Sequence, residues 1–401
     1  MNDRYVCAFR GARDHYQAAI ALAECDRLET LITDAYATPS VRAWLSRLPL
    51  PMRNTILARH ADGVPNERVR CLWDVAFIEQ VRHRLGFSPR STWLSLDRRF
   101  GEAAASEARR TRAHLLMYSP YAWEAFTVPY SHHPRRVLFQ YHPHPLLEER
   151  LLAEDRRRFP GIGESFAEGR ARHDAHLLAR ERESWRHADA IVCSSAFTMQ
   201  SLVEAGCDPS ICHVVPYGVR LPEPADPPSP PAVFEALFVG SGGQRKGLHH
   251  LLLAWQRAAL REARLTLVCR VIDHAIRLLA RSIPGVEIRH GASASELDAM
   301  YARSTLFVMP SMVEGFGHVY LEALARGCPV LGTPNSALPD LGAEADGIFV
   351  TPAGDIDQLT AMLQRLASGL RSDTAIRAAS RRTAERHPWS NFRRELRATL
   401  Q

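Results

Sequence analysis

Short apolar runs alternate with longer segments whose apolar residues recur at helical spacing along the whole chain. In the first half the runs predict strands at Tyr5–Phe9, Thr30–Thr33, His114–Tyr118, Arg136–Tyr141, Ala190–Ser194 and His213–Val215. In the second half they predict strands at Glu235–Val239, Arg264–Arg270, Val286–Arg289, Thr305–Met309, Pro329–Gly332 and Gly347–Val350. Strands that alternate with helices form parallel sheets covered on both faces. About a dozen strands exceed one domain, so we expect two doubly wound α/β sheets.

A proline-rich stretch separates the two halves. The residues RLPEPADPPSPPAVFE (Arg220–Glu235) contain prolines that cannot donate to a sheet ladder, so we interpret them as an interdomain linker. Before them, Leu146–Arg186 is dense in arginine, glutamate and alanine without a β-branched run, which predicts solvated helices.

Composition excludes several classes of protein. The 401 residues are 46% hydrophobic and 23% charged, which is enough to build a large core and argues against disorder. No apolar run reaches the roughly 18 residues of a membrane-spanning helix, and the opening residues lack the apolar core of a secretion signal. We therefore expect a cytoplasmic protein. The cysteines are scattered without a C-x-x-C pair, which predicts reduced, buried thiols, and no cluster of histidine, cysteine and carboxylate shows metal-ligand spacing.

The charge balance is mildly basic, and one basic residue differs from all the others. The net charge of +6 favours an anionic ligand or membrane surface but is too small to indicate nucleic acid. Lys246 is the only lysine among 50 basic residues. A coding bias toward arginine explains why the other basic residues are arginines. Lys246 stands out against that bias, which indicates a position that needs a compact ammonium group and not a planar guanidinium. Arginine clusters in DRRF, EARRTRAH and DRRRFP fit either a peripheral contact with an anionic membrane or solvated helix faces.

Two turns of the second half carry candidate chemistry, and the first of them suits phosphate. In FVGSGGQRKGLHHLLLAW (Phe238–Trp255) a strand leads through a glycine-rich loop into a helix. The start of such a helix favours anions because its backbone N–H groups lack partners. The loop matches neither the G-x-x-x-x-G-K-[ST] nor the G-x-G-x-x-G pattern. A flexible turn with a solvated Arg245–Lys246 pair is therefore the alternative to phosphate binding.

The second turn places two carboxylates close to one helix start. After the predicted strand Thr305–Met309, a loop carries Glu314, and a helix is expected from about Gly317 to Arg326, with Glu322 one turn into it. Glycines between the carboxylates let the backbone approach a ligand closely. Taken singly, Glu322 could pair with Arg326, and Glu314 could be a favourable charge beside the helix N-terminus.

These motifs resemble a known family. The E-x7-E stretch EGFGHVYLEALARGCPV, the loop FVGSGGQRKG and ALPDLGAEADGIFVTPAGDIDQL are similar to the C-terminal domain of family 4 retaining glycosyltransferases. FQYHPHP, ADAIVCSSAFTMQSLVEAGCD and VVPYGV resemble their N-terminal domain. The resemblance implies a GT-B fold of two Rossmann-like domains: residues 1–220 for the acceptor, 221–385 for the nucleotide-sugar, and a helix over 386–401 that crosses back to the first domain.

The resemblance also implies roles for individual residues. Lys246 would bind the donor diphosphate, Glu314 would face the donor sugar, and Glu322 would bind the ribose hydroxyls. His142 would lie beside the reacting centre, with His144 as the alternative, or either could be a structural loop histidine. The expected catalytic residues are thus Glu314, His142 and Lys246. The other expected donor contacts are Arg245, Ser241, Gly242, Ala292, Ser293, Gly315, Phe316, Gly317, His318, Val319 and Glu322, and those on the acceptor side are Gly11, Arg13 and His144.

The sequence departs from the family pattern in two places. Ser241 stands where the family commonly has an arginine, so the second cation for the diphosphate is either absent or supplied by Arg245. The opening loop is reduced to FRGARDHYQ around Gly11. A D-x-D triplet at Asp355 and Asp357 sits at a predicted helix start, which favours capping over metal binding. We therefore expect no metal and no cofactor.

The predicted activity is transfer of a sugar, with retention, from a UDP- or GDP-sugar to a glycan, lipid-linked or small-molecule acceptor. Leaving-group stabilisation would dominate the mechanism, because no carboxylate nucleophile is obvious in the N-terminal half. The alternatives are a GT-B sugar-nucleotide epimerase, a phosphorylase, or a non-catalytic anion-binding scaffold of the same fold.

Overall fold

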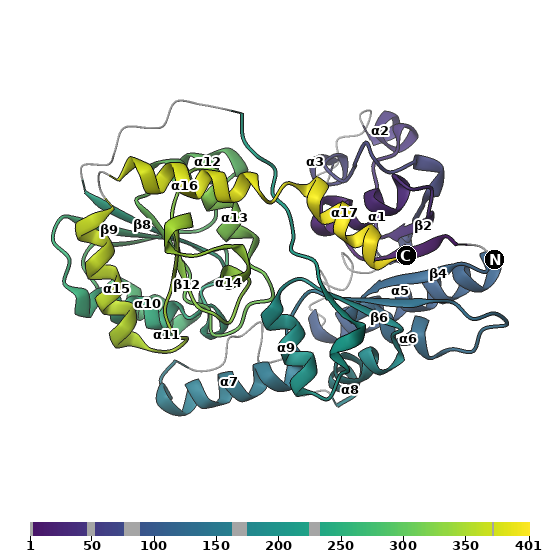
Figure 1. The fold of residues 1–401 in the computed structure, drawn as a ribbon, viewed down its shortest axis with the longest axis horizontal. Helices are drawn as coiled ribbons and strands as arrows, with labels where there is room; N and C mark the ends of the chain where they lie inside the picture. Colours follow the sequence, from purple (N-terminus) through teal and green to yellow (C-terminus); the bar gives the residue numbers. More distant parts are fainter. Residues whose placement is uncertain (1–2, 46–52, 76–88, 163–174, 224–232, 371–372) are drawn as a thin grey trace.

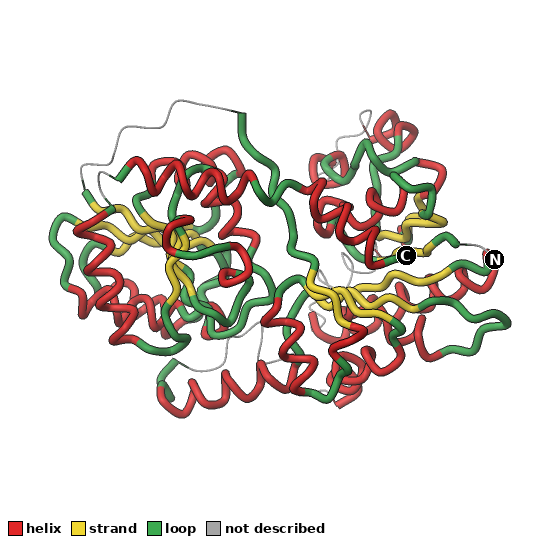
Figure 2. Tube along the Cα trace, in the orientation of Figure 1, coloured by secondary structure: helices red, strands yellow, loops and turns green. Residues whose placement is uncertain are grey.

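The computed structural model describes residues 3–45, 53–75, 89–162, 175–223, 233–370 and 373–401. Within these ranges the strands form two fully parallel sheets, each with helices on both faces (Figures 1 and 2). The first sheet has the order β3-β2-β1-β4-β5-β6-β7, and the second has the order β10-β9-β8-β11-β12-β13. The order reverses beside β1 and beside β8, so each sheet has a switch point where the loops after two strands diverge and leave room for a ligand.

The first sheet is built from short, mostly buried strands. They are β1 (Tyr5–Ala8), β2 (Leu28–Thr33), β3 (Val69–Cys71), β4 (His114–Tyr118), β5 (Arg136–Gln140), β6 (Ala190–Cys193) and β7 (Cys212–Val214). The helices of this half are α1 (Gln17–Ala23), α2 (Pro39–Leu45), α3 (Arg53–Leu57), α5 (Pro89–Thr111), α6 (Ala122–Thr127), α7 (Pro145–Arg158), α8 (Ala175–Glu183) and α9 (Ala196–Glu204).

The second sheet follows the linker. Its strands are β8 (Phe234–Val239), β9 (Ala263–Val268), β10 (Val286–Arg289), β11 (Leu306–Val308), β12 (Val330–Gly332) and β13 (Ile348–Val350). The helices are α10 (Leu248–Ala258), α11 (His274–Ser282), α12 (Ala294–Arg303), α13 (His318–Ala325), α14 (Leu338–Leu341), α15 (Ile356–Gly369), α16 (Thr374–Glu385) and α17 (Trp389–Thr399).

The strand predictions are confirmed to within two residues at each end, with one omission. β3 was missed because its three residues, Val-Arg-Cys, alternate in polarity at an edge of the sheet and leave no apolar run. The predicted linker ends too late, because Phe234 and Glu235 already belong to β8; residues 224–232 of that prediction lie outside the described ranges. Of the predicted solvated helices, α7 and α8 are present, and residues 163–174 are not described.

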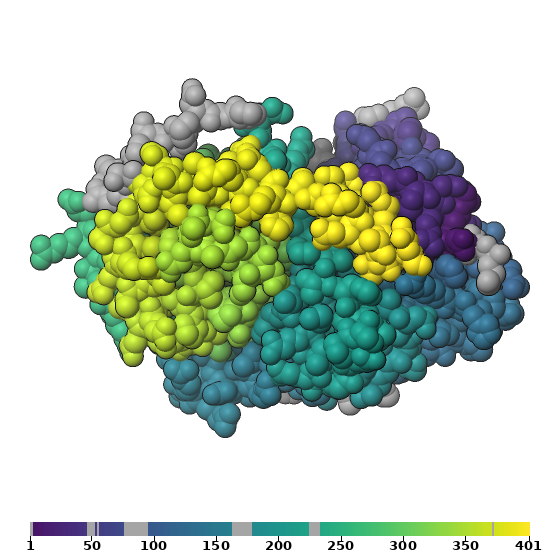
Figure 3. Space-filling view, viewed as in Figure 1, coloured from purple at the N-terminus to yellow at the C-terminus, as the bar shows by residue number. Residues whose placement is uncertain are grey.

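The C-terminal segment joins the two lobes. It crosses from α16, on the second domain, to α17, on the first, as Figures 1 and 3 show. α17 packs beside α1, where Arg393 pairs with Glu24 at 2.8 Å. The Leu400 carbonyl at its end accepts hydrogen bonds from the Tyr5 hydroxyl and from Arg135. At the crossing, the Val219 amide donates to the His387 carbonyl at 2.9 Å, so both interdomain connections run side by side.

The expectation that the cysteines are reduced and buried is met only in part. All eight cysteines are free thiols, and six are buried; Cys25, however, is exposed and Cys71 is half-buried, so the prediction of burial is wrong for these two. No helix in the described part of the chain is long and apolar enough to cross a bilayer.

Candidate functional site

The glycine-rich loop after β8 holds Lys246 against the loop that follows β11. Gln244–Lys246 form a single 3-10 turn, which ends at Gly247 with φ +64°. A Cβ on Gly247 would lie 1.9 Å from the Pro310 carbonyl oxygen, so only glycine allows the two loops to approach this closely. α10 begins at the next residue.

Glu314 lies where the two loops meet, and its carboxylate is the centre of a charge cluster. The Glu314 side chain forms an ion pair with Lys246 and lies 3.7 Å from the guanidinium of Arg245. Burial raises the pKa of the Glu314 carboxyl, but Lys246 and Arg245 outweigh burial and lower that pKa to about 2. Glu314 is therefore an anion, and both of its cationic partners come from the glycine-rich loop after β8.

His142 reaches the same cluster from the other domain, at the end of β5. Its Nε2 lies 3.2 Å from Nη1 of Arg245, and its Nδ1 lies 3.4 Å from the Glu148 carboxylate. Burial lowers the pKa of His142, and the positive charge of Arg245 acts in the same direction against the opposing effect of Glu148. A neutral imidazole thus faces the basic loop across the domain interface.

His144, the alternative candidate, has a structural role. It is buried, it caps the start of α7 through the amide of Leu146, and its Nε2 lies 3.1 Å from the carbonyl oxygen of Arg182. Its main-chain N–H donates to the Ser201 hydroxyl at 2.8 Å. The structure therefore places His142, and not His144, beside Lys246 and Glu314.

The domains meet at the backbone of Gly315. A Cβ there would lie 2.0 Å from the Tyr141 carbonyl oxygen. The Gly315 carbonyl accepts hydrogen bonds from the hydroxyls of Ser195 and Thr198, at the start of α9. Asp340 closes the contact from the second domain, since its carboxylate accepts a hydrogen bond from the Ala196 amide at 2.8 Å. The loop that carries Glu314 is thus bonded directly to the first domain.

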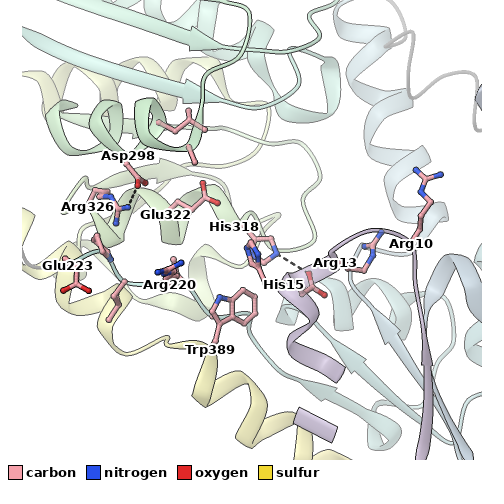
Figure 4. Close-up of a pocket in the computed structure, with 17 residues that line it drawn as sticks. Arg10, Arg13, His15, Arg220, Glu223, Asp298, His318, Glu322, Arg326 and Trp389 are labelled. Atoms are coloured by element: carbon pink, nitrogen blue, oxygen red, sulfur yellow. Dashed lines mark ion pairs between the residues drawn. The ribbon is translucent and has the colours of Figure 1, made fainter. Parts of the chain in front are cut away.

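A cavity of about 900 Å³ lies between the domains and is lined by 17 residues, among them Glu322, His318 and Arg13 (Figure 4). Glu322 is exposed to it and accepts a hydrogen bond from the Tyr301 hydroxyl at 3.1 Å. Arg326 pairs with Asp298 at 2.5 Å, so the sequence alternative of a Glu322–Arg326 pair is wrong.

α13 presents its first turn to this cavity. Its cap, Gly317, has φ +87°, and His318 follows it with the imidazole stacked on Tyr217 at 4.5 Å between ring centroids. Phe316 is buried with its edge toward the same tyrosine, and Val319 is half-buried. His318 also lies 3.7 Å from Asp14 of the first domain, which connects the helix start to the β1–α1 loop.

On the first-domain side, the β1–α1 loop places Arg13 over aromatic rings. The Arg13 guanidinium lies 4.2 Å from the centroid of Tyr141 and also covers Tyr118. The Gly11 amide donates to Asp34 at 2.8 Å, which pins the start of the loop. Asp14, His15 and Tyr16 all have left-handed backbones, a costly conformation that turns this loop toward the cavity.

The remaining predicted residues lie farther from the charge cluster or have local roles. Ser241 is exposed, and Gly242 packs under Ile272 with its amide donating to the Val271 carbonyl. Ala292 is half-buried, whereas the Ser293 hydroxyl and amide are engaged in the capping box of α12. Asp355 caps α15, as the sequence predicts.

Sequence reasoning missed several residues that the fold brings to the site. Arg220 and Trp389 line the cavity because both interdomain connections pass beside it, and no local motif marks them. The sequence also showed no cluster of metal-ligand type, yet the structure gathers Asp155, His249 and His250 with their ligand atoms within 4.8 Å of one another. Sequence spacing could not reveal this group, because Asp155 lies 94 residues before His249 and on the other domain.

Comparisons with known proteins fit this geometry. Residues 234–368 match the family model described as glycosyl transferases group 1. The chain is 32% identical over 187 residues to the MMP α-(1→4)-mannosyltransferase of Mycolicibacterium hassiacum, covering 44% of this chain and 45% of that protein. The chain spans about half the length of the curated relatives it matches.

Solved structures resemble the whole chain. The sucrose-phosphate synthase of Thermosynechococcus elongatus superposes with a TM-score of 0.68 at 17% identity, covering 98% of both chains. Anabaena Alr3699/HepE, solved in complex with UDP and glucose, gives a TM-score of 0.62 at 15% identity, covering 99% of both chains. The chain therefore has the GT-B fold, and its residues 234–368 are similar in sequence to the glycosyl transferases group 1.

Proposed function

We propose that this protein is a retaining glycosyltransferase that moves a sugar from a UDP- or GDP-sugar to a glycan, lipid-linked or small-molecule acceptor. The observation that carries the proposal is the convergence of Lys246 and Arg245 on the buried Glu314 carboxylate, with His142 facing them from the other domain. The named activity of the mannosyltransferase relative supports sugar transfer, and the complex of Alr3699/HepE with UDP and glucose supports a nucleotide-sugar donor.

The charge cluster explains how a donor would be held. Without donor, the two cations neutralise Glu314; when a diphosphate enters, Lys246 and Arg245 bind its oxygens, and Glu314 turns to the hydroxyls of the sugar. As the bond from sugar to diphosphate breaks, negative charge grows on the leaving oxygens. Fixed cations and the N–H groups at the start of α13 stabilise that charge. The proposal places no divalent cation on the diphosphate, so the rate of transfer should not depend on added Mg²⁺ or Mn²⁺.

The cavity supplies the second half of the proposal. Glu322 lies on its second-domain wall, where it would accept hydrogen bonds from the ribose, and Arg13 lies on its first-domain wall, where it would contact the acceptor. His142 is neutral and lies at the interface, which suits a hydrogen bond to the transferring sugar. The acceptor would enter between the β1–α1 loop and α13, near an anionic membrane surface if it is lipid-linked.

A donor assay tests the proposal. Purified protein is incubated with UDP- and GDP-sugars, release of the nucleoside diphosphate is measured with and without acceptor mixtures, and the anomer of the product is determined by NMR. Release of the diphosphate with a retained anomer supports the proposal. Inversion would refute retention. Binding of sugar nucleotides without any turnover would favour the scaffold, and a product that is an isomerised donor would favour the epimerase.

A further inference from the structure

Three titratable side chains form a buried cluster between the domains, away from Glu314 and the cavity. Asp155 comes from the C-terminal half of α7, and His249 and His250 come from the first turn of α10. The three side chains are between 0% and 1% exposed. Polar groups of this kind are rarely withdrawn from water so completely unless they bind one another or a ligand.

The polar atoms of this cluster are incompletely satisfied. Nε2 of His249 lies 3.0 Å from Oδ2 of Asp155 in a hydrogen bond. Nε2 of His250 lies 2.8 Å from Oδ1 of Asp155, yet neither atom has a hydrogen-bond partner among the described residues. The Nδ1 atoms of both imidazoles also lack a partner among the described residues. Buried polar atoms without partners are rare in proteins, and a bound ion would satisfy the two that face each other.

We propose that Asp155, His249 and His250 bind a divalent transition-metal ion, which we assign as Zn²⁺. Two imidazoles and one carboxylate form a ligand set that zinc prefers. With bonds of about 2.0–2.1 Å, ligand atoms around tetrahedral zinc lie about 3.3 Å apart. In the structure, Nε2 of His250 lies 2.8 Å from Oδ1 of Asp155, and Nε2 of His249 lies 3.0 Å from Oδ2. All the ligand atoms lie within 4.8 Å of one another, so binding an ion requires only small movements of the three side chains. The remaining tetrahedral position would hold a water molecule.

The surroundings of the cluster support a metal-binding role. The Gln244 amide donates to Oδ2 of Asp155 at 2.7 Å and to the Leu152 carbonyl at 3.0 Å, which orients the carboxylate as outer-shell groups do around metal ligands. Phe159 covers both imidazoles, with its ring centroid 5.3 and 5.1 Å from theirs. The metal would be structural, because its three ligands are almost fully buried and lie away from Glu314 and the cavity.

The position of the site gives the ion a mechanical role. It would join α7 of the first domain to α10 of the second, and Gln244 directly precedes the Arg245–Lys246 pair. Metal binding would therefore hold the domains together beside the glycine-rich loop. This role is separate from the proposed sugar transfer, and it is tested without any activity assay.

Metal analysis of the untagged protein tests the proposal. We expect about one equivalent of zinc after purification without chelators. Protein stripped by a strong chelator should regain thermal stability when Zn²⁺ is added back. Asp155→Asn and His250→Ala should lose both the metal and this response, whereas His290→Ala, which removes an exposed histidine, should keep them.

Cobalt substitution separates loss of a ligand from loss of the fold. Co²⁺ added to stripped protein should produce the visible absorption of a tetrahedral site. His250→Cys should retain Co²⁺ and add a thiolate-to-cobalt band in the near ultraviolet, a signature that a structural role alone would not produce. Metal-free protein that shows neither stabilisation by Zn²⁺ nor Co²⁺ absorption would overturn the proposal and leave the cluster as a hydrogen-bonded contact.

Discussion

Replacing Gly315 by alanine tests whether close apposition of the domains is needed for transfer. Its Cβ would lie 2.0 Å from the Tyr141 carbonyl oxygen and 3.1 Å from Cα of His142, and both obstacles are backbone atoms that cannot rotate away. Since non-bonded carbon and oxygen atoms stay about 3 Å or more apart, the two backbones must separate by roughly 1 Å. A shift of this size at a reacting centre costs on the order of a hundredfold in rate.

The clash lies between domains, so each sheet should still fold. We therefore expect Gly315→Ala to lower kcat about a hundredfold while the circular dichroism spectrum stays that of the wild type. The assay is release of nucleoside diphosphate from the best donor at saturating acceptor. Gly161→Ala is the matched control, because Gly161 is exposed and a Cβ there meets no atom within 4 Å. A Gly315→Ala enzyme with the turnover of this control would refute the reasoning that the observed apposition of the domains is the catalytic one.

Four further outcomes are expected. Lys246→Ala should lower turnover by about two to three orders of magnitude, because it removes a charge contact to the leaving group, and Lys246→Arg should not restore full activity; near wild-type rates for the alanine variant would remove Lys246 from the site. Because Glu322 would accept a hydrogen bond from the 2′ hydroxyl, UDP or GDP should bind about ten- to hundredfold more tightly than its 2′-deoxy counterpart in calorimetric titration. Glu322→Ala should abolish this preference. Equal affinities of the wild type for both nucleotides would contradict the proposed contact of Glu322 with the ribose. Because the Glu314 pKa is lowered to about 2 from 4.5, its ionised form contributes stability above pH 4.5 that is lost as the pH falls toward 2, and Glu314→Gln should weaken that dependence in acid unfolding curves. In sedimentation with anionic lipid vesicles at low salt, the arginine clusters of the first half should carry the protein into the pellet; protein that stays in the supernatant would falsify the membrane contact.

Local patterns along the chain were sufficient for much of the fold. Buried parallel strands form continuous apolar runs, and glycine or proline commonly marks a helix end, so most strands, many helix ends and the start of the linker follow from neighbouring residues. The same holds for the two loops with Lys246 and Glu314, because a loop between a strand and a helix start is a local arrangement. β3 escaped prediction because an edge strand with alternating polarity leaves no apolar run.

Tertiary structure decided which of these residues meet. Whether His142 or His144 faces Lys246 depends on how β5 is placed against the second domain, and no pattern within FQYHPHP distinguishes the two. Asp155 and His249 belong to different domains, and Arg220 and Trp389 reach the cavity only because both interdomain connections pass beside it. Contacts between residues far apart in the sequence depend on how whole domains pack. The free energy of that packing is a sum over many side chains, so no short stretch of sequence indicates which distant residues will meet.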